Sequence, residues 1–266
     1  MNIYFDIALN LASERFSGER DKVIADALSR NVNYFNIVCS SLNELDFVKD
    51  LNDRYGQNSC FTLGVHPHNA NELNENTLKY IKHYIKIHQP SAVGETGLDF
   101  FRNLSSYENQ INAFEQQIII SIENNLPLFL HQREAHDDFI KVIDKYICDI
   151  PSGVVHCFTG TQYQLDDYLE RDLYVGLTGW ICDERRNKDL RESIKNIPMD
   201  KLMIETDAPY LIPRSLEKKP KNNRNEPKFL PHIANEVATL MNIDLKQFNK
   251  QVLNNSKSFF EINFQD

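Results

Sequence analysis

The sequence predicts an α/β fold, a (β/α)8 TIM barrel that forms a single domain over residues 1–266. Eight short apolar segments alternate with longer amphipathic segments, which is the pattern of parallel strands joined by crossover helices. Eight such repeats within 266 residues fit a closed barrel of ordinary size. The alternative is an open doubly wound sheet, but no G-x-G-x-x-G or G-x-x-x-x-G-K-S/T motif follows the first apolar segment.

The apolar segments are the predicted strands. They occupy residues 3–9, 33–39, 60–65, 91–94, 127–131, 153–158, 173–178 and 201–205. Between them, apolar residues recur at a period of about 3.6, which predicts helices. The most regular helical patterns cover residues 107–124 and 229–241. No linker rich in Pro, Gly or Ser divides the chain, so one domain is expected.

Composition and charge limit the class of protein. Hydrophobic residues make up 41% and charged residues 25%, which is typical of a soluble globular protein. No apolar segment is long enough to span a membrane, and the N-terminus lacks a basic region, so we expect neither an anchor nor a signal peptide. Five cysteines without a CxxC motif indicate reduced thiols and a cytoplasmic location. The net charge of −9 disfavours a protein that coats nucleic acid, and no obligate protein partner is evident.

Titratable residues stand at the carboxyl ends of most predicted strands. In a parallel barrel these ends meet at one face, where the active site lies. The residues are Asp6, His66, His68, Glu95, His131, His156, Glu205 and Asp207.

Converging carboxylates and imidazoles predict a divalent metal ion, because without a cation the acids would repel one another. Glu95, between Gly94 and Thr96, is placed to anchor one ion or to bridge two, although alone it also fits a helix N-cap. Such an ion activates water, and Asp207 would bind the metal, take the proton from the water, or do both. The predicted reaction is metal-assisted hydrolysis.

Several motifs then follow one another in order, namely "GVHPH", "GETGLDF", "LHQREAHDDF", "HCFTGT" and "IETDAPYL". Together they resemble the TatD family of metal-dependent deoxyribonucleases, which belongs to the amidohydrolase-like barrels. The segments "FDIALNLAS", "GWICDERR" and "RNEP" resemble the branch that contains TatD itself. The resemblance covers nearly the whole chain. It implies a magnesium-dependent 3′–5′ exonuclease that trims single-stranded DNA, with RNA as a further substrate, in the cytoplasm.

The resemblance also implies residue roles. Glu95, His131, His156 and Asp207 would be metal ligands, and the catalytic residues would be Asp207, Glu95 and His66, with His66 near the scissile phosphate. Many relatives carry an H-x-H pair after the first strand, whereas this chain has Ala8 and Asn10 there. The expected number of Mg²⁺ ions is therefore one or two, with Mn²⁺ or Zn²⁺ as alternative metals.

The substrate is an anion, so cations near the site are candidate ligands. We expect substrate contacts from Arg102, Arg224, His68 and Arg133, with Arg185 and Arg186 as further candidates. Arg133 can instead pair with Glu134 or Asp137. The basic segment 213–228 follows the last strand and either tracks phosphates or is a solvated surface. Bases could stack on aromatic residues near the loops, although most aromatics are core residues; these are Phe100, Phe101, Phe158, Trp180 and Tyr210.

Three other functions remain open from the sequence. One is a barrel hydrolase that acts on another ester or amide, or on a phosphotriester. A second is an esterase that removes an amino acid from tRNA, since the same activated water can attack an ester carbonyl. The third is a barrel that binds nucleic acid without catalysis. The absence of the H-x-H pair after the first strand leaves this possibility open.

Overall fold

The computed structural model describes residues 2–185 and 187–262, and these form the predicted (β/α)8 barrel. Eight parallel strands follow one another in chain order around the barrel. Their bounds are β1 Tyr4–Leu9, β2 Val32–Ile37, β3 Ser59–Leu63, β4 Ala92–Asp99, β5 Leu128–Arg133, β6 Gly153–Val155, β7 Tyr174–Leu177 and β8 Leu202–Ile204.

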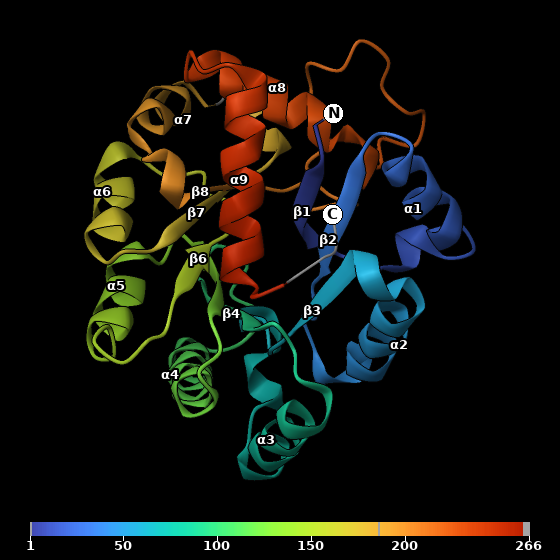
Figure 1. The fold of residues 1–266 in the computed structure, drawn as a ribbon. Coiled ribbons are helices and arrows are strands. Elements are labelled where there is room, and N and C mark those ends of the chain that lie inside the picture. The colour runs from blue at the N-terminus through green and yellow to red at the C-terminus, as the bar shows by residue number, and fades with distance from the viewer. Residues whose placement is uncertain (1, 186, 263–266) are drawn as a thin grey trace.

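Most of the helices form the outer ring of the barrel, and the last one crosses one of its ends (Figure 1). The helices are α1 Arg20–Leu28, α2 Leu45–Tyr55, α3 Glu75–His88, α4 Tyr107–Asn124, α5 His136–Asp144, α6 Gln162–Glu170, α7 Lys188–Ser193, α8 Leu230–Leu240 and α9 Leu245–Phe259. The predicted helix 107–124 matches α4, which begins after the N-cap Ser106, and 229–241 matches α8 to within a residue. In the described part of the chain, no helix combines the length and apolarity that a membrane crossing requires.

The barrel closes between β1 and the segment that follows β8. The Asp6 carboxylate accepts a hydrogen bond from the backbone N–H of Thr206 at 2.8 Å and another from the Thr206 hydroxyl. The backbone N–H of Asp207 donates to the carbonyl of Ala8 at 3.0 Å, and an isolated bridge joins Leu9 to Ala208. These contacts hold Asp207 against the end of the first strand.

Helix α9 crosses in front of the barrel in Figure 1 and covers the amino ends of the strands. Asn255 of α9 donates hydrogen bonds to the carbonyls of Met199 and Leu202, at the start of β8. Phe260, just after α9, is buried and stacks on Phe5 with the ring centroids 5.5 Å apart. One end of the barrel is therefore filled by apolar side chains, and the carboxyl end carries the polar ones.

Candidate active site

One carboxylate oxygen, Glu95 Oε1, contacts three imidazoles at the carboxyl end of the barrel. Glu95 Oε1 lies 2.7 Å from His131 Nδ1, 2.7 Å from His156 Nε2 and 3.3 Å from His66 Nε2. Glu95 belongs to β4, His131 to β5, and His66 and His156 follow β3 and β6. The cluster thus joins residues from four consecutive strands, as the strand-end pattern predicted.

The strand that carries Glu95 is longer than predicted. We placed its end at residue 94 and Glu95 in the following turn, but β4 continues to Asp99. Gly97 makes this extension possible, because its φ is +142° and a Cβ there would lie 1.9 Å from the carbonyl oxygen of His131. The backbones of β4 and β5 therefore approach closely beside the cluster, which holds Glu95 and His131 together.

The charges of this cluster are set by its neighbours. Burial raises the pKa of Glu95, but the imidazoles of His156 and His66 outweigh it and hold that pKa well below its usual range. Burial lowers the pKa of His156, yet the carboxylates of Glu95 and Glu205 raise it well above the ordinary value. For His66 burial prevails and lowers the pKa to about 4. Glu95 is accordingly an ionised carboxylate at neutral pH.

The donor set fits a divalent cation. Ligand atoms of His66, Glu95 and His131 lie within 4.8 Å of one another, and His131 Nδ1 is 3.4 Å from His156 Nε2. The other nitrogens of these two rings face away from Glu95: His131 Nε2 lies 3.5 Å from Asp99 Oδ2, and His156 Nδ1 lies 3.5 Å from Glu205 Oε1. Imidazole nitrogens and a carboxylate oxygen that face one point are the usual ligands of catalytic divalent metals.

Asp99 supports the cluster from behind, and the sequence analysis missed it. Its Oδ2 lies 2.7 Å from His68 Nε2 and 3.5 Å from His131 Nε2. Burial raises the pKa of Asp99, but the imidazoles of His131 and His68 outweigh it and hold the pKa well below its usual range. Side chains along a strand point to alternate faces with a period of two. Had this strand been predicted to reach residue 99, Glu95 and Asp99 would have been expected on the same face.

Glu205 contacts the cluster from the position directly after β8. It is fully buried, its Oε1 accepts a hydrogen bond from the backbone N–H of Cys157, and the same oxygen lies 3.5 Å from His156 Nδ1. The other oxygen, Oε2, has no partner within the described chain. A carboxylate behind a ligating histidine orients the ring and makes the other nitrogen a stronger ligand.

Asp207 is held by Asn10, from the segment after β1. Asn10 Nδ2 donates a hydrogen bond to Asp207 Oδ1 at 2.8 Å, while Ala8 is buried and offers no ligand atom. Burial raises the pKa of Asp207 to about 7, with Glu95 acting in the same direction against His156. In the described residues, Asp207 forms no ion pair or hydrogen bond with the His–Glu cluster. Its predicted role as a ligand stays a prediction.

The predicted substrate-binding residues differ in their surroundings. His68 contacts Asp99, as described above. Arg102 is exposed, and its backbone N–H donates to Asp99 Oδ1 at 2.8 Å. The guanidinium carbon of Arg133 lies 3.9 Å from the ring centroid of Phe101, and no pairing with Glu134 or Asp137 is found between these described residues. All three lie around β4 and β5, beside the cluster.

Arg224 is engaged elsewhere. Its guanidinium contacts Glu19 Oε2 at 2.6 Å, Glu226 Oε1 at 2.9 Å and the carbonyl of Arg15 at 2.7 Å. These bonds fix the loop to the segment before α1. The donors of Arg224 already have protein partners. Its predicted contact with the substrate stays a prediction.

The basic segment 213–228 follows Asp207 in the chain, and its C-terminal part lies beside the same residue. Its Asn225 is buried and donates from Nδ2 to the carbonyl of Thr206 at 2.8 Å. Arg214 pairs with Asp183 at 3.0 Å. Three lysines of the segment make no ion pair with any described residue; they are Lys218, Lys219 and Lys221. Arg185 also pairs with Asp183, and Arg186 lies outside the described residues.

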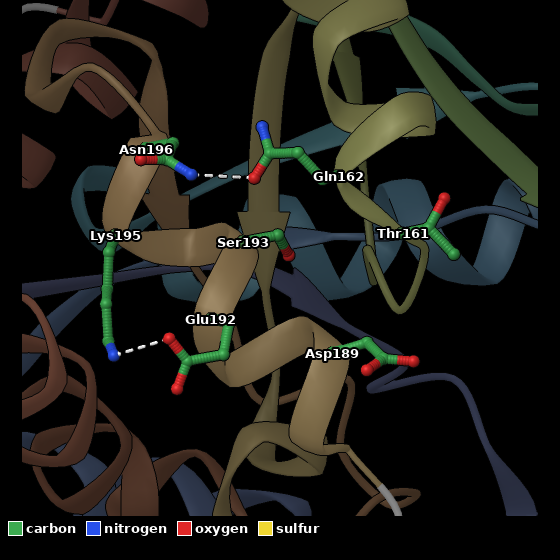
Figure 2. A pocket seen from close by; sticks show the side chains of 7 residues that line it. All are labelled: Thr161, Gln162, Asp189, Glu192, Ser193, Lys195 and Asn196. Carbon is green, nitrogen blue, oxygen red and sulfur yellow. Dashed lines mark hydrogen bonds and ion pairs between the residues drawn. The ribbon is translucent and has the colours of Figure 1, made fainter.

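A separate surface pocket lies between α6 and α7 (Figure 2). Among the residues of its walls, Asn196 donates to Gln162 at 2.7 Å and Lys195 pairs with Glu192 at 2.8 Å. Figure 2 shows no histidine among the labelled side chains, so this pocket lacks the donor set of the Glu95 cluster.

The fold and site define a class: a parallel barrel hydrolase with imidazole and carboxylate side chains gathered at the carboxyl ends of its strands. The chain belongs to the family of TatD-related DNases, whose family model matches residues 5–261. It is a hydrolytic nuclease, and the expected family resemblance is confirmed.

Two relatives illustrate the similarity. The chain is 40% identical over 256 residues to the "3'-5' ssDNA/RNA exonuclease TatD" of Pantoea ananatis, covering 96% of this chain and 98% of the relative. It is 42% identical over 259 residues to the protein of the same name from Citrobacter rodentium, covering 97% and 98%.

Solved structures agree on the fold. A TatD homologue from Escherichia coli superposes with a TM-score of 0.89 at 24% identity and covers 98% of both chains. A TatD-family hydrolase from Entamoeba histolytica has a TM-score of 0.87 at 26% identity and covers 97% of this chain and 98% of its own.

Proposed function

We propose that the protein is a divalent-metal-dependent 3′–5′ exonuclease that hydrolyses single-stranded DNA and RNA, with Mg²⁺ as its metal. One observation carries the proposal: three imidazoles surround the Glu95 carboxylate at the open end of the barrel. The relatives that share about 40% of its sequence are named for this reaction. The acidic chain would act on its anionic substrate in the cytoplasm, as expected from an N-terminus without a signal-peptide pattern and from cysteines without disulfide-type spacing.

The cation would be held by Glu95, His131 and His156, with Asp207 completing the set. When bound, such an ion polarises the scissile phosphodiester and lowers the pKa of water. Glu95 holds the site together, because it contacts both of these histidines. His66 lies 3.3 Å from the same oxygen, and its ring would border the scissile phosphate, as the family resemblance implies.

Asp207 receives the proton of the attacking water. Asn10 donates to Oδ1, which orients the carboxylate and leaves Oδ2 to accept the proton. Asn10 stands where the family resemblance places a histidine. In this chain the residue therefore positions the base Asp207 and does not offer an imidazole to the metal. Because positions 8 and 10 offer no imidazole, the arrangement favours a single ion held by Glu95, His131, His156 and Asp207.

The substrate backbone is bound by cations around the same face. Arg102, Arg133 and His68 border the cluster through Asp99 and Phe101. The segment 213–228, which carries three lysines unpaired within the described chain, is fixed beside Asp207 by the hydrogen bond from Asn225 to the carbonyl of Thr206. Arg224 supports this segment through Glu19 and Glu226.

Substitution of the site carboxylates tests the proposal. We expect Glu95→Gln and Asp207→Asn each to slow the shortening of a 3′-extended single strand in Mg²⁺ by about 10²-fold or more, because each removes a charge that the reaction needs. The control is Glu75→Gln, which changes an exposed acid on α3 and should leave the rate unchanged. Circular dichroism checks that each variant folds.

Full activity in excess chelator would contradict the metal requirement. Wild-type rates in Glu95→Gln would contradict the assigned site. Release of an amino acid from aminoacyl-tRNA without any shortening of DNA or RNA would instead support the esterase alternative.

A further inference from the structure

We propose that the connection between β4 and α4 binds a nucleobase of the single-stranded substrate by stacking. The site consists of Phe101, Leu104 and Tyr107, which we call the β4–α4 patch, together with the flanking Arg102 and Arg133. The inference rests on the proposed function and adds a base-binding subsite to it.

The patch exposes an unusual amount of apolar surface. Phe101 is 51% exposed, Leu104 is 63% exposed and Tyr107 is 46% exposed, all within residues 101–107. Single exposed apolar residues are common, but a group of them beside a catalytic site marks a binding surface. Since every nucleobase has an apolar π-face, an exposed aromatic ring is a suitable partner.

The rings of this patch are held in place before any ligand binds. Arg133 covers Phe101, with its guanidinium carbon 3.9 Å from the ring centroid. Tyr107 stacks on Phe100 with the centroids 4.6 Å apart and the planes at 30°. Pre-organised rings lose little entropy when a base stacks on them.

The charges beside the patch suit a nucleotide. Arg102 and Arg133 are exposed, and neither guanidinium has a carboxylate partner within the described chain. A purely hydrophobic partner would leave these two cations unpaired at its edge. A nucleotide places its base on the aromatic ring and its phosphate on a guanidinium, which satisfies both features.

The patch is directly connected to the catalytic cluster. Asp99 accepts the backbone N–H of Arg102 on Oδ1 at 2.8 Å and contacts His68 on Oδ2 at 2.7 Å. Asp99 ends β4, the strand that carries Glu95. A strand whose 3′ end lies at Glu95 therefore passes the patch within the next few nucleotides.

The test measures binding to oligonucleotides that lack one base. Fluorescence anisotropy gives the Kd of labelled single strands for the Asp207→Asn protein in Mg²⁺, with one abasic position moved stepwise from the 3′ end. We expect one position at which the missing base weakens binding about ten-fold. Adding Phe101→Ala should weaken binding of the intact strand by a similar factor and abolish the effect of that position.

Two further variants act as controls. Phe101→Trp keeps a stacking ring and should retain the positional effect, so it separates stacking from misfolding. Tyr80→Ala removes an aromatic side chain of similar exposure on α3, at 42%, and should leave the abasic profile unchanged.

The outcomes separate this subsite from the function on which it rests. A flat abasic profile, or a positional effect that survives Phe101→Ala, overturns the subsite while the nuclease stands. Failure of the wild-type protein to bind or shorten any single strand overturns the proposed function itself.

Discussion

At the scale of single residues, Glu95 organises the site. Its Oε1 contacts the rings of His66, His131 and His156, and nearby imidazoles keep the carboxylate ionised. Such an arrangement requires the backbone beside it to be placed within a fraction of an ångström. Gly97 provides this, because any side chain there would strike β5.

We therefore expect Gly97→Ala to destabilise the protein by about 3 kcal/mol or more. The methyl group would lie 1.9 Å from the His131 carbonyl oxygen, and φ of +142° is unfavourable for alanine. Urea unfolding measures the change in the free energy of unfolding. Activity should fall as well, since His131 must move away from Glu95.

Gly18→Ala is the matched control. Its φ is +74°, but nothing lies within 4 Å of the added Cβ, so only the conformational cost of about 1–2 kcal/mol should appear. Equal losses for the two variants would show that the contact between β4 and β5 is not as tight as the structure indicates.

At the scale of elements, the strands divide the molecule into a packed end and a reactive end. Strand β4 places Glu95, Gly97 and Asp99 on alternate positions, with the acids toward the histidines. Helix α9 and the residues after it cover the opposite end. The two ends have separate tasks, so stability and activity can be altered separately.

Phe260→Ala tests this separation. Phe260 is 2% exposed and packs against Phe5, so its truncation should lower the free energy of unfolding by about 3–5 kcal/mol. The nuclease rate per folded molecule, measured well below the melting temperature, should change little. Phe47→Ala, at a position 41% exposed, should cost less than about 1 kcal/mol. A large fall in the rate at full folding would argue for coupling between the two ends.

At the scale of the whole molecule, the protein is acidic, with a net charge of −9, yet its substrate is an anion. Positively charged side chains near the site must therefore bind the substrate, because the acidic protein as a whole repels it. The unpaired lysines of segment 213–228 are the main candidates on the Asp207 side. Their neighbours Arg214, Arg224 and Lys228 already pair with acids.

Salt dependence measures this contribution. The logarithm of affinity for a single strand should fall linearly with the logarithm of salt concentration, by about 0.7 per phosphate contact. Replacing Lys218, Lys219 and Lys221 by Gln should reduce the slope by about 2 if each contacts one phosphate. Lys79→Gln with Lys86→Gln, on the exposed side of α3, should leave the slope unchanged. A slope unaffected by the loop substitutions would assign binding to other cations.

The barrel and its reactive end could be predicted from the amino-acid sequence. Apolar periodicity distinguishes strands from helices, and parallel strands present their carboxyl ends on one face. Glu95, His66, His131 and His156 were found this way, and the structure gathers them. Tertiary structure alone decided the length of β4, the support from Asp99 and the engagement of Arg224 with Glu19 and Glu226. It also paired Asn10 with Asp207, 197 residues apart. Such pairings depend on strand register and on the paths of loops, which local patterns do not encode.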